Sequence, residues 1–386
     1  MKILHLCLGC FYIDNYSYQE NLMPKYHKYL GYDVEIIASL ITFDKNGKGT
    51  FLSEGSSYIN EHGIKVTRID NKKPLKIYRK LNRYVGTYEA IEKAAPDIIF
   101  IHGCQFLDIY IVIEYLKKHA DVKVYVDNHA DFSNSATNFL SKNILHKLLW
   151  KKCANSILPF TEKFYGVLPA RVDFLVDLYK LPKDKCELLV MGADDERVKS
   201  AEAPQVKEII RKKYNINEND FLIVTGGKID LFKKQTLLLM DAVNKIDCEN
   251  VKLIVFGSVV EELKEEVNKR CSDKVQYIGW VQSDESYKYF ASADLAVFPG
   301  RHSVFWEQVA GQGIPMLVKR WAGTTHIDLD GNVLFLYDDS EYEILQNLQK
   351  IIKDKDLYDK MKESAVEKGF KTFSYLNIAK RAIEVD

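Results

Sequence analysis

The stretch FLIVTGGKIDLFKKQTLLLMDAVNKIDCENVKLIVFGS, residues 221–258, decides the fold class of this chain. Its two ends, FLIVTGG and KLIVFGS, are short apolar runs that stop at a glycine or just after one, as expected of buried parallel strands. The segment between them predicts a helix over residues 234–243. A strand, a helix and a second strand in this order are typical of a parallel sheet with helical crossovers.

The same alternation of strands and helices runs along the chain in two successive series. Strands are expected at KILHLCLG, YDVEIIAS, KVTRID, DIIFIHG, VKVYVDN, SILPF, FLIVTGG, KLIVFGS, VQYIG, LAVFPG and PMLVKR. Helices are expected near residues 20–30, 85–95, 107–119, 234–243, 260–271 and 285–291, and from Ser303 onward. The series meet near residues 182–206, a segment with prolines, charges and a glycine. This pattern predicts an α/β protein with two Rossmann-like, doubly wound domains that face each other across a cleft, and the cleft is the expected active site.

Composition excludes several classes of function. Lys and Arg number 54 and Asp and Glu number 54, so no net charge attracts the chain to nucleic acid. The seven cysteines are scattered, which favours a reducing compartment over a disulfide framework. No apolar run approaches the roughly 20 residues of a membrane span, and the N-terminal MKILHLCLGC reads as a buried strand and not as a signal peptide. We therefore expect a cytoplasmic protein.

Dinucleotide oxidoreductases share this layout, but their phosphate-binding signature is missing. After the first strand, residues 7–12 read C-L-G-C-F-Y, and after FLIVT the pair Gly226-Gly227 leads to Lys228. Neither segment is G-x-G-x-x-G, and the sequence holds no P-loop.

The strand ends of the second half instead predict an anion site. Lys228 ends one strand and Lys234 stands at the head of the next helix, so two cations and a helix N-terminus can meet one anion. Gly300 and Ser303 precede another helix, and Glu307 lies one turn beyond Ser303 on the same face. This spacing suits a carboxylate that accepts hydrogen bonds from the ribose diol of a bound nucleotide. The alternative is that both lysines are solvated loop residues.

Several segments, in their order along the chain, resemble the retaining glycosyltransferases of the GT-B fold, in particular the large family 4 of bacterial polysaccharide and glycolipid enzymes. The segments that carry the resemblance are LGYDVEIIAS, DNHADF, ARVDFLVDLYKLPKDKCELLVMGADDERV, GGKIDLFKKQTLLLMDA, YIGWVQSDESYKYFASADLAVFPG, EQVAGQGIPML and FKTFSYLNIAKRA. The resemblance covers almost the full length and implies that the last segment is a helix crossing back to the first domain. We expect domains at residues 1–188, joined by about 370–386, and at residues 189–369.

The resemblance implies transfer of a sugar from a nucleotide-diphosphate donor to a hydroxyl of a glycan or lipid-linked acceptor, with retention at the anomeric carbon. Lys228, Lys234 and the backbone amides from Gly300 to Val304 would stabilise the charge of the departing diphosphate. No cluster of aspartates suggests a metal site, and no cofactor is expected. A nucleotide-sugar epimerase of the same architecture, or a binding protein that has lost catalysis, stays open as an alternative.

One departure from the family pattern affects the donor sugar. The family usually carries E-x7-E, but the residue eight positions before Glu307 is Pro299. Arg301 or His302 is expected to occupy the space of the missing carboxylate.

Four further residues are candidates through the resemblance or through position. His129, in VDNHADF, is expected to contact the donor sugar near the reacting carbon, with a satisfied strand-end histidine as the alternative; His102 is placed similarly. Gly227 belongs to the phosphate turn. Trp280 stands where the family holds the base, although a lone Trp is often core packing.

Two basic clusters in the first half suggest a docking surface. NKKPLKIYRKLNRY covers residues 71–84, and SKNILHKLLWKK, residues 141–152, interleaves lysines with leucines and Trp150. A helix with an apolar stripe beside a basic one suits anionic lipid headgroups, which would place the protein peripherally at the inner membrane face. The alternative is an amphipathic helix whose apolar stripe faces the core.

Overall fold

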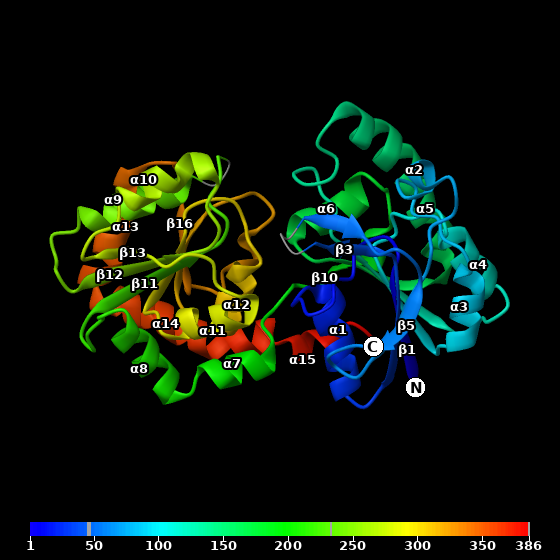
Figure 1. Cartoon of the computed structure of the whole chain (residues 1–386), viewed down its shortest axis with the longest axis horizontal. Coiled ribbons are helices and arrows are strands. Elements are labelled where there is room, and N and C mark those ends of the chain that lie inside the picture. Colours follow the sequence, from blue (N-terminus) through cyan, green and yellow to red (C-terminus); the bar gives the residue numbers. More distant parts are fainter. Residues whose placement is uncertain (45–47, 232–233, 385–386) are drawn as a thin grey trace. The chain divides into compact units, whose positions relative to one another are not determined.

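The computed structural model describes residues 1–44, 48–231 and 234–384, and the chain divides into two units (Figure 1). Unit 1 comprises Met1–Val190 and Ile378–Asp386, and unit 2 comprises Met191–Asn377. The described residues from Ile378 on are thus grouped with unit 1.

Unit 1 is built on a sheet with the strand order β10-β9-β8-β7-β1-β2-β6-β5, in which β5 alone runs antiparallel to its neighbour among the described strands. The strands of unit 1 are β1 Lys2–Cys7, β2 Asp33–Ala38, β3 Ile41–Phe43, β4 Gly49–Phe51, β5 Ser56–Ile59, β6 Lys65–Arg68, β7 Ile98–His102, β8 Lys123–Asn128, β9 Thr161–Gly166 and β10 Cys186–Leu188. Strand β7 is buried along its whole length, and β1 and β8 are buried from their second residue on, which is why they read as continuous apolar runs. The short pair β3–β4 lies outside this sheet.

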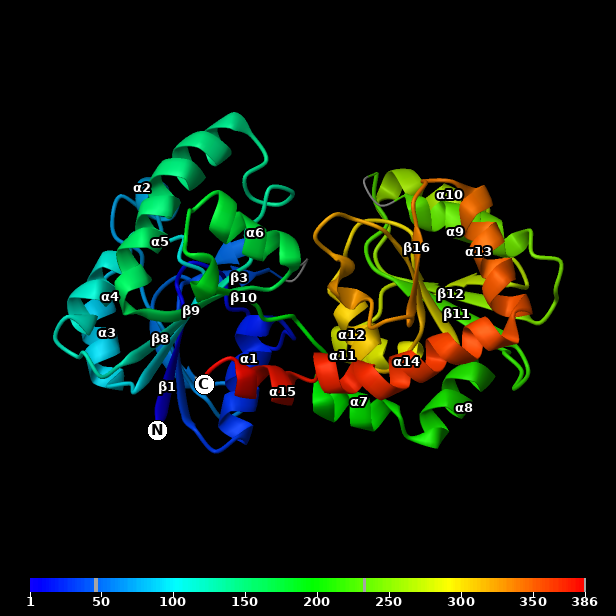
Figure 2. The same cartoon turned by 180° about the vertical axis from the view of Figure 1, so that it is seen from behind.

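Helices cover both faces of this sheet. The helices are α1 Gln19–Tyr29, α2 Leu75–Tyr78, α3 Thr87–Ala94, α4 Ile109–Leu116, η1 Ser141–Trp150, α5 Lys151–Ile157, η2 Leu158–Phe160, α6 Pro169–Asp177 and η3 Lys183–Lys185. Helices α3, α4 and α5 contribute to one core cluster with the central strands, and α1 lies on the other side of the sheet (Figure 2).

Unit 2 has a wholly parallel sheet with the order β13-β12-β11-β14-β15-β16. Its strands are β11 Phe221–Gly226, β12 Val251–Phe256, β13 Val275–Tyr277, β14 Leu295–Phe298, β15 Met316–Lys319 and β16 Val333–Leu336. Strands β12 and β13 follow β11 on one side of the sheet, and strands β15 and β16 follow β14 on the other side. The order therefore reverses between β11 and β14, and such a switch point opens a crevice at the carboxyl ends of the two strands.

The helices of unit 2 flank this sheet, and α15 completes the chain. They are α7 Asp195–Ala201, α8 Pro204–Lys213, α9 Gln235–Asn244, η4 Glu261–Leu263, α10 Lys264–Asn268, α11 Ser283–Ala291, α12 Phe305–Gly311, η5 Thr325–Ile327, α13 Glu341–Lys353, α14 Lys355–Phe373 and α15 Tyr375–Arg381. The helix expected from residue 370 differs from the structure, because α14 ends at Phe373 and the extended backbone of Ser374 separates it from α15. Across the parts of the chain described above, no helix combines the length and apolarity needed to span a bilayer.

Candidate donor site

The predicted phosphate-binding residues of unit 2 meet at the switch point. A small hollow at the ends of β11 and β14 is lined by Thr225, Gly226, Gly227, Lys228, Thr236, Phe298, Pro299, Gly300, Arg301 and Ser303. The sequence placed these residues on two segments about 70 positions apart, and the sheet order makes them neighbours.

Glycine is required where the chain leaves β11. Gly227 has φ +134°, a backbone conformation that other residues rarely adopt, and Gly257, at φ +129°, approaches it closely. A Cβ added to Gly257 would lie 1.9 Å from the carbonyl oxygen of Gly227. The turns that follow β11 and β12 therefore pack with their backbones in contact. Because both residues are glycines, no side chain of theirs fills the space beside Lys228.

The two predicted cations both lie at this edge, with different surroundings. Lys228 is exposed, and its Nζ lies 3.5 Å from Asp230 Oδ2, so the side chain is held near the turn by a weak ion pair. Lys234 is exposed and caps the N-terminus of α9. Its backbone position places a positive charge beside the positive end of the helix dipole.

Glu307 is fully buried and is bound by two histidines. His302 Nε2 donates to Glu307 Oε1 over 2.7 Å, and His326 Nε2 donates to the same oxygen over 2.9 Å. His302 precedes α12, and His326 lies in η5 after β15. Sequence reasoning placed Glu307 and His302 here but missed His326, because nothing in the local pattern around Thr325–Ile327 marks a contact 19 residues away.

These contacts keep the Glu307 carboxylate ionised. Burial by itself raises the pKa of Glu307, but the charges and hydrogen bonds of His302 and His326 lower it more, so the pKa lies far below its usual range. The second oxygen, Oε2, is buried and has no hydrogen-bond partner in the described residues. An ionised, unpartnered oxygen is the group that a ligand hydroxyl would satisfy.

Other buried polar atoms in this region are also unpartnered among the residues that the structure describes. They are Gln235 Oε1, Trp306 Nε1 and His326 Nδ1. Gln235 begins α9, and its Oε1 would lie 3.4 Å from a Cβ added to Gly300. These three atoms lie on residues of α9, α12 and η5 and do not belong to the lining of the hollow.

Unit 1 holds the predicted His129 at the end of β8. Its side chain is 30% exposed, and its Nε2 lies 3.4 Å from Asp127 Oδ1 and 3.9 Å from Glu20 Oε1. His102, the weaker candidate, is fully buried and uses both ring nitrogens for hydrogen bonds to His5 and Asp127. Only His129 of these two is therefore accessible to a ligand.

Two predicted donor-binding residues, Trp280 and Val304, do not line the hollow. Trp280 is 68% exposed after β13 and does not line the hollow. The helix expected from Ser303 begins at Phe305. Val304 is its N-cap and is half exposed. Ser303 Oγ accepts a hydrogen bond from the Phe305 amide over 3.4 Å. Helix α12 has only seven residues, so it contributes little dipole.

Two groups of side chains in the described residues combine types that bind metals. They are Glu20, His102 and His129, and His302, Glu307 and His326. In the first group a metal on His102 would have to break a bond to His5 or Asp127. In the second, the Nε2–Oε1 separations of 2.7 and 2.9 Å are shorter than the roughly 3.3 Å between ligands of a tetrahedral zinc about 2.0 Å away. The second group therefore has the geometry of a hydrogen-bonded cluster, and in the first group both ring nitrogens of His102 are already used.

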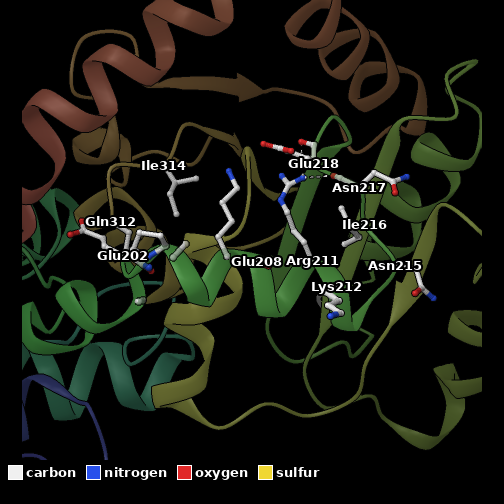
Figure 3. A pocket seen from close by; sticks show the side chains of 14 residues that line it. Glu202, Glu208, Arg211, Lys212, Asn215, Ile216, Asn217, Glu218, Gln312 and Ile314 are labelled. Carbon is white, nitrogen blue, oxygen red and sulfur yellow. Dashed lines mark hydrogen bonds between the residues drawn. The ribbon is translucent and has the colours of Figure 1, made fainter.

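A larger hollow of about 1110 Å³ lies elsewhere in unit 2, beside α8 (Figure 3). Charges of both signs line it, and Arg211 donates to the carbonyls of Asn217 and Asp220 and pairs with Asp294 over 2.7 Å. Asp220 and Asp294 directly precede β11 and β14, so this region adjoins the amino ends of the strands. Ligands of doubly wound sheets bind at the carboxyl ends, and we therefore assign the site to the smaller hollow.

Comparisons with known proteins bear on the fold of the chain and on part of unit 2. Residues 220–354 match the family described as glycosyl transferases group 1, and this range contains all the predicted donor residues. The uncharacterized glycosyltransferase MJ1607 of Methanocaldococcus jannaschii is 22% identical over 218 residues, a match that covers 54% of this chain and 55% of that relative.

Solved structures match over nearly the full length. A glycosyltransferase from Rickettsia africae covers 98% of this chain and 96% of its own, with 17% identity and a TM-score of 0.68. Anabaena Alr3699/HepE, solved in complex with UDP, covers 99% and 98%, with 14% identity and a TM-score of 0.69. The chain therefore has the GT-B fold of these structures, and residues 220–354 of its second unit are similar to glycosyl transferases group 1.

Proposed function

We propose that this protein transfers a glycosyl group from a nucleotide-diphosphate sugar to a hydroxyl acceptor, with retention at the anomeric carbon. The observation that carries the proposal is the ionised and unpartnered Oε2 of Glu307 in the same unit as the glycine- and lysine-lined hollow. A diphosphate needs cations and backbone amides, and a ribose needs a hydrogen-bond acceptor. The edge formed by β11 and β14 offers both kinds of group.

In this proposal the diphosphate lies beside Gly227, Lys228 and the N-terminus of α9. The departing diphosphate gains negative charge as the sugar ring becomes oxocarbenium-like, so fixed positive groups stabilise the transition state more than the ground state. Lys228 and Lys234 supply that charge. The leaving phosphate takes the proton of the acceptor, and no protein nucleophile is required.

We propose that one of the two candidates, Arg301 and not His302, stands in for the missing first glutamate. His302 is bound to Glu307, whereas Arg301 lines the hollow. We therefore assign contact with the donor sugar to Arg301 and support of Glu307 to His302. His129 of unit 1, which is accessible, would contact the sugar near the reacting carbon.

A panel assay tests the proposal. The protein is incubated with labelled UDP-, GDP- and ADP-sugars, with and without EDTA, and with glycan and lipid-linked acceptors. We expect release of nucleoside diphosphate that is insensitive to EDTA and increases with an acceptor. Epimerisation without transfer would favour the epimerase alternative, and no change in any donor would contradict both.

We further propose that unit 1 docks on an anionic lipid surface. Leu140, Ile144 and Leu148 are spaced by four residues on η1, so they share one face. Leu140 is 63% and Leu148 64% exposed, while His146 and Trp150 on the opposite face are buried. The side chains of η1 that face the core are therefore not the ones that form the outward apolar stripe.

The outward stripe is flanked by positive charge. Lys147 and Lys152 are exposed on η1 and α5, and Lys76 and Lys80 are exposed at α2. Figures 1 and 2 both place α2 and the projecting η1–α5 helix at the same end of unit 1. Exposed aliphatic side chains among lysines complement a bilayer with anionic headgroups, and a lipid-linked acceptor would be found there.

A further inference from the structure

Three buried histidines in unit 1 form one continuous row of hydrogen bonds. His27 Nε2 donates to the carbonyl of Ala379 over 2.9 Å, and His27 Nδ1 lies 3.0 Å from His5 Nε2. His5 Nδ1 lies 2.9 Å from His102 Nε2, and His102 Nδ1 lies 2.7 Å from Asp127 Oδ2. All three rings and Asp127 have no exposed surface. The row joins the C-terminal segment to the end of β8.

Counting protons shows that this row carries a charge. Both of its ends, a carbonyl and a carboxylate, accept hydrogen bonds, so its four contacts require four protons. Three neutral imidazoles carry only three. One further proton must therefore be held in the row, and each of the three rings can carry it with all four bonds intact.

The neighbours of Asp127 favour its ionised form and so place this extra proton on a ring. Gln19 Nε2 donates to Asp127 Oδ2 over 3.1 Å, and the Gly103 amide donates to Oδ1 over 3.1 Å. A carboxylate that accepts several hydrogen bonds stays ionised. The pKa of Asp127, which burial alone would raise, lies far below its usual range because of the charges of His102 and His129.

His102 is the ring that holds the extra proton. Burial lowers its pKa, but the charges of Asp127, Cys7 and Glu20 raise it further, to about 9. Burial lowers the pKa of His27 to about 4 and that of His5 well below its usual value, with a smaller contribution from their histidine neighbours. The titratable groups facing the row are thus Cys7 on β1, Glu20 on α1, and Asp127 and His129 at β8.

The row ends beside the accessible His129. Its Nε2 is buried, with the carboxylate oxygens Asp127 Oδ1 3.4 Å and Glu20 Oε1 3.9 Å away. We infer that Asp127 is the positioning residue of His129: it holds the ring with the proton on Nε2, and the three-histidine row keeps Asp127 ionised. The role of Asp127 in turnover rests on the proposed function. The extra proton held by the three-histidine row does not depend on that function.

Ring-nitrogen NMR on the full wild-type chain tests the row, and a variant is needed only to assign the His102 signals. With ¹⁵N-labelled histidine, His102, assigned through His102→Gln, should be doubly protonated at pH 7.5 and should lose a proton near pH 9. Because this pKa is raised, the stabilisation that the charged ring contributes is complete below about 6.5 and is lost as the pH rises through 9. A neutral His102 at pH 7.5 would overturn the inference.

Asp127→Asn tests the positioning step. It should make His102 neutral at pH 7.5 and turn His129 from the Nε2–H tautomer into a mixture, while kcat for donor turnover falls about 10- to 100-fold with little change in donor KM. Asp108→Asn is the matched control, since Asp108 is equally buried but bonds to Arg83, Tyr84 and Thr87. It should leave both rings unchanged.

The outcomes separate the two proposals. If the His129 tautomer is unchanged in Asp127→Asn, the positioning role is wrong. It is also wrong if that variant keeps wild-type turnover although the protonation of its histidine rings has changed. If the wild-type protein turns over no nucleotide sugar, the proposed function is wrong. The NMR spectra of wild type and Asp127→Asn still decide whether Asp127 and the histidine row hold His129.

Discussion

At the scale of single residues, Glu307 shows how a buried charge is maintained for binding. An isolated carboxylate in an apolar interior would take up a proton, because desolvation of the charge costs far more than protonation at neutral pH. Two Nε2–H groups on one oxygen prevent this. They leave the other oxygen unpartnered, which costs about 1–3 kcal/mol until a ligand satisfies it.

Glu307→Gln should therefore weaken nucleoside diphosphate binding by about 1–3 kcal/mol, which is about 5- to 150-fold. The glutamine fits the same volume and its Oε1 can still accept from both histidines, but the two hydrogen bonds then end on a neutral oxygen, so the free energy of unfolding should also decrease by about 1–3 kcal/mol. Calorimetric titration with UDP and GDP measures the first effect, and thermal unfolding measures the second.

Glu285→Gln is the control, because Glu285 is an exposed glutamate of the same unit that pairs with Lys288. It should change neither quantity by more than about 0.5 kcal/mol. Since the pKa of Glu307 is lowered, its contribution is complete above the ordinary value of 4.5 and is lost only as the pH falls through the lowered value. Equal nucleotide affinity in wild type and Glu307→Gln would reduce Glu307 to a structural residue.

The position of a residue in the fold could be predicted where the local sequence pattern determines it. Gly227, Lys228, Gly300 and Glu307 follow apolar strands or begin a helix, so their position at one sheet edge follows from the fold class. His326 was not predictable, because its partner Glu307 is brought to it by tertiary packing alone. The row from His27 to Asp127 was missed for the same reason, since its members lie on four separate elements.

At the scale of elements, most buried strands were predictable and helix faces were not. The strand predicted at SILPF, residues 156–160, was wrong, because this segment ends α5 and forms η2, and β9 begins only at Thr161. The predicted strands KILHLCLG, DIIFIHG and FLIVTGG correspond to β1, β7 and β11. Helix η1 instead carries apolar residues on two faces, and periodicity cannot say which face packs on the core. Contrary to the expectation of one stripe, Trp150 is buried while Leu148 is exposed.

The outward face of η1 predicts lipid binding. Wild-type protein should co-sediment with vesicles of anionic phospholipid at low salt and be released at high salt, because the lysines act over a Debye length of about 8 Å at physiological ionic strength. Replacing Leu140, Ile144 and Leu148 by Gln should reduce binding at least tenfold, since partial burial of three aliphatic side chains contributes on the order of 2 kcal/mol.

Ile209→Gln with Val366→Gln is the matched control, since both residues are exposed apolar side chains of unit 2. Binding to neutral vesicles at high salt, or retention of binding by the η1 variant, would contradict docking through this face. Loss of self-association in the η1 variant without any vesicle binding in wild type would identify the face as a protein interface.

At the scale of the whole molecule, two series of strands and helices predicted two doubly wound units. The structure separates them after Val190, close to the expected residue 188, because prolines and charges mark the linker. The return of the chain to unit 1 starts at Ile378, later than the expected residue 370, since the break at Ser374 has no strong sequence signal. The fold alone does not fix donor, acceptor or stereochemistry, which depend on side chains at the edge of the sheet.

The central claim is that a nucleoside diphosphate binds at the carboxyl ends of β11 and β14. Hydrogen–deuterium exchange of the full chain, with and without saturating UDP, GDP or ADP, tests it most directly. For at least one nucleotide, the account predicts slower amide exchange in peptides covering residues 226–231 and 299–307, with no change over residues 201–218 beside α8. Protection confined to residues 201–218, or no protection by any of the three nucleotides, would contradict it.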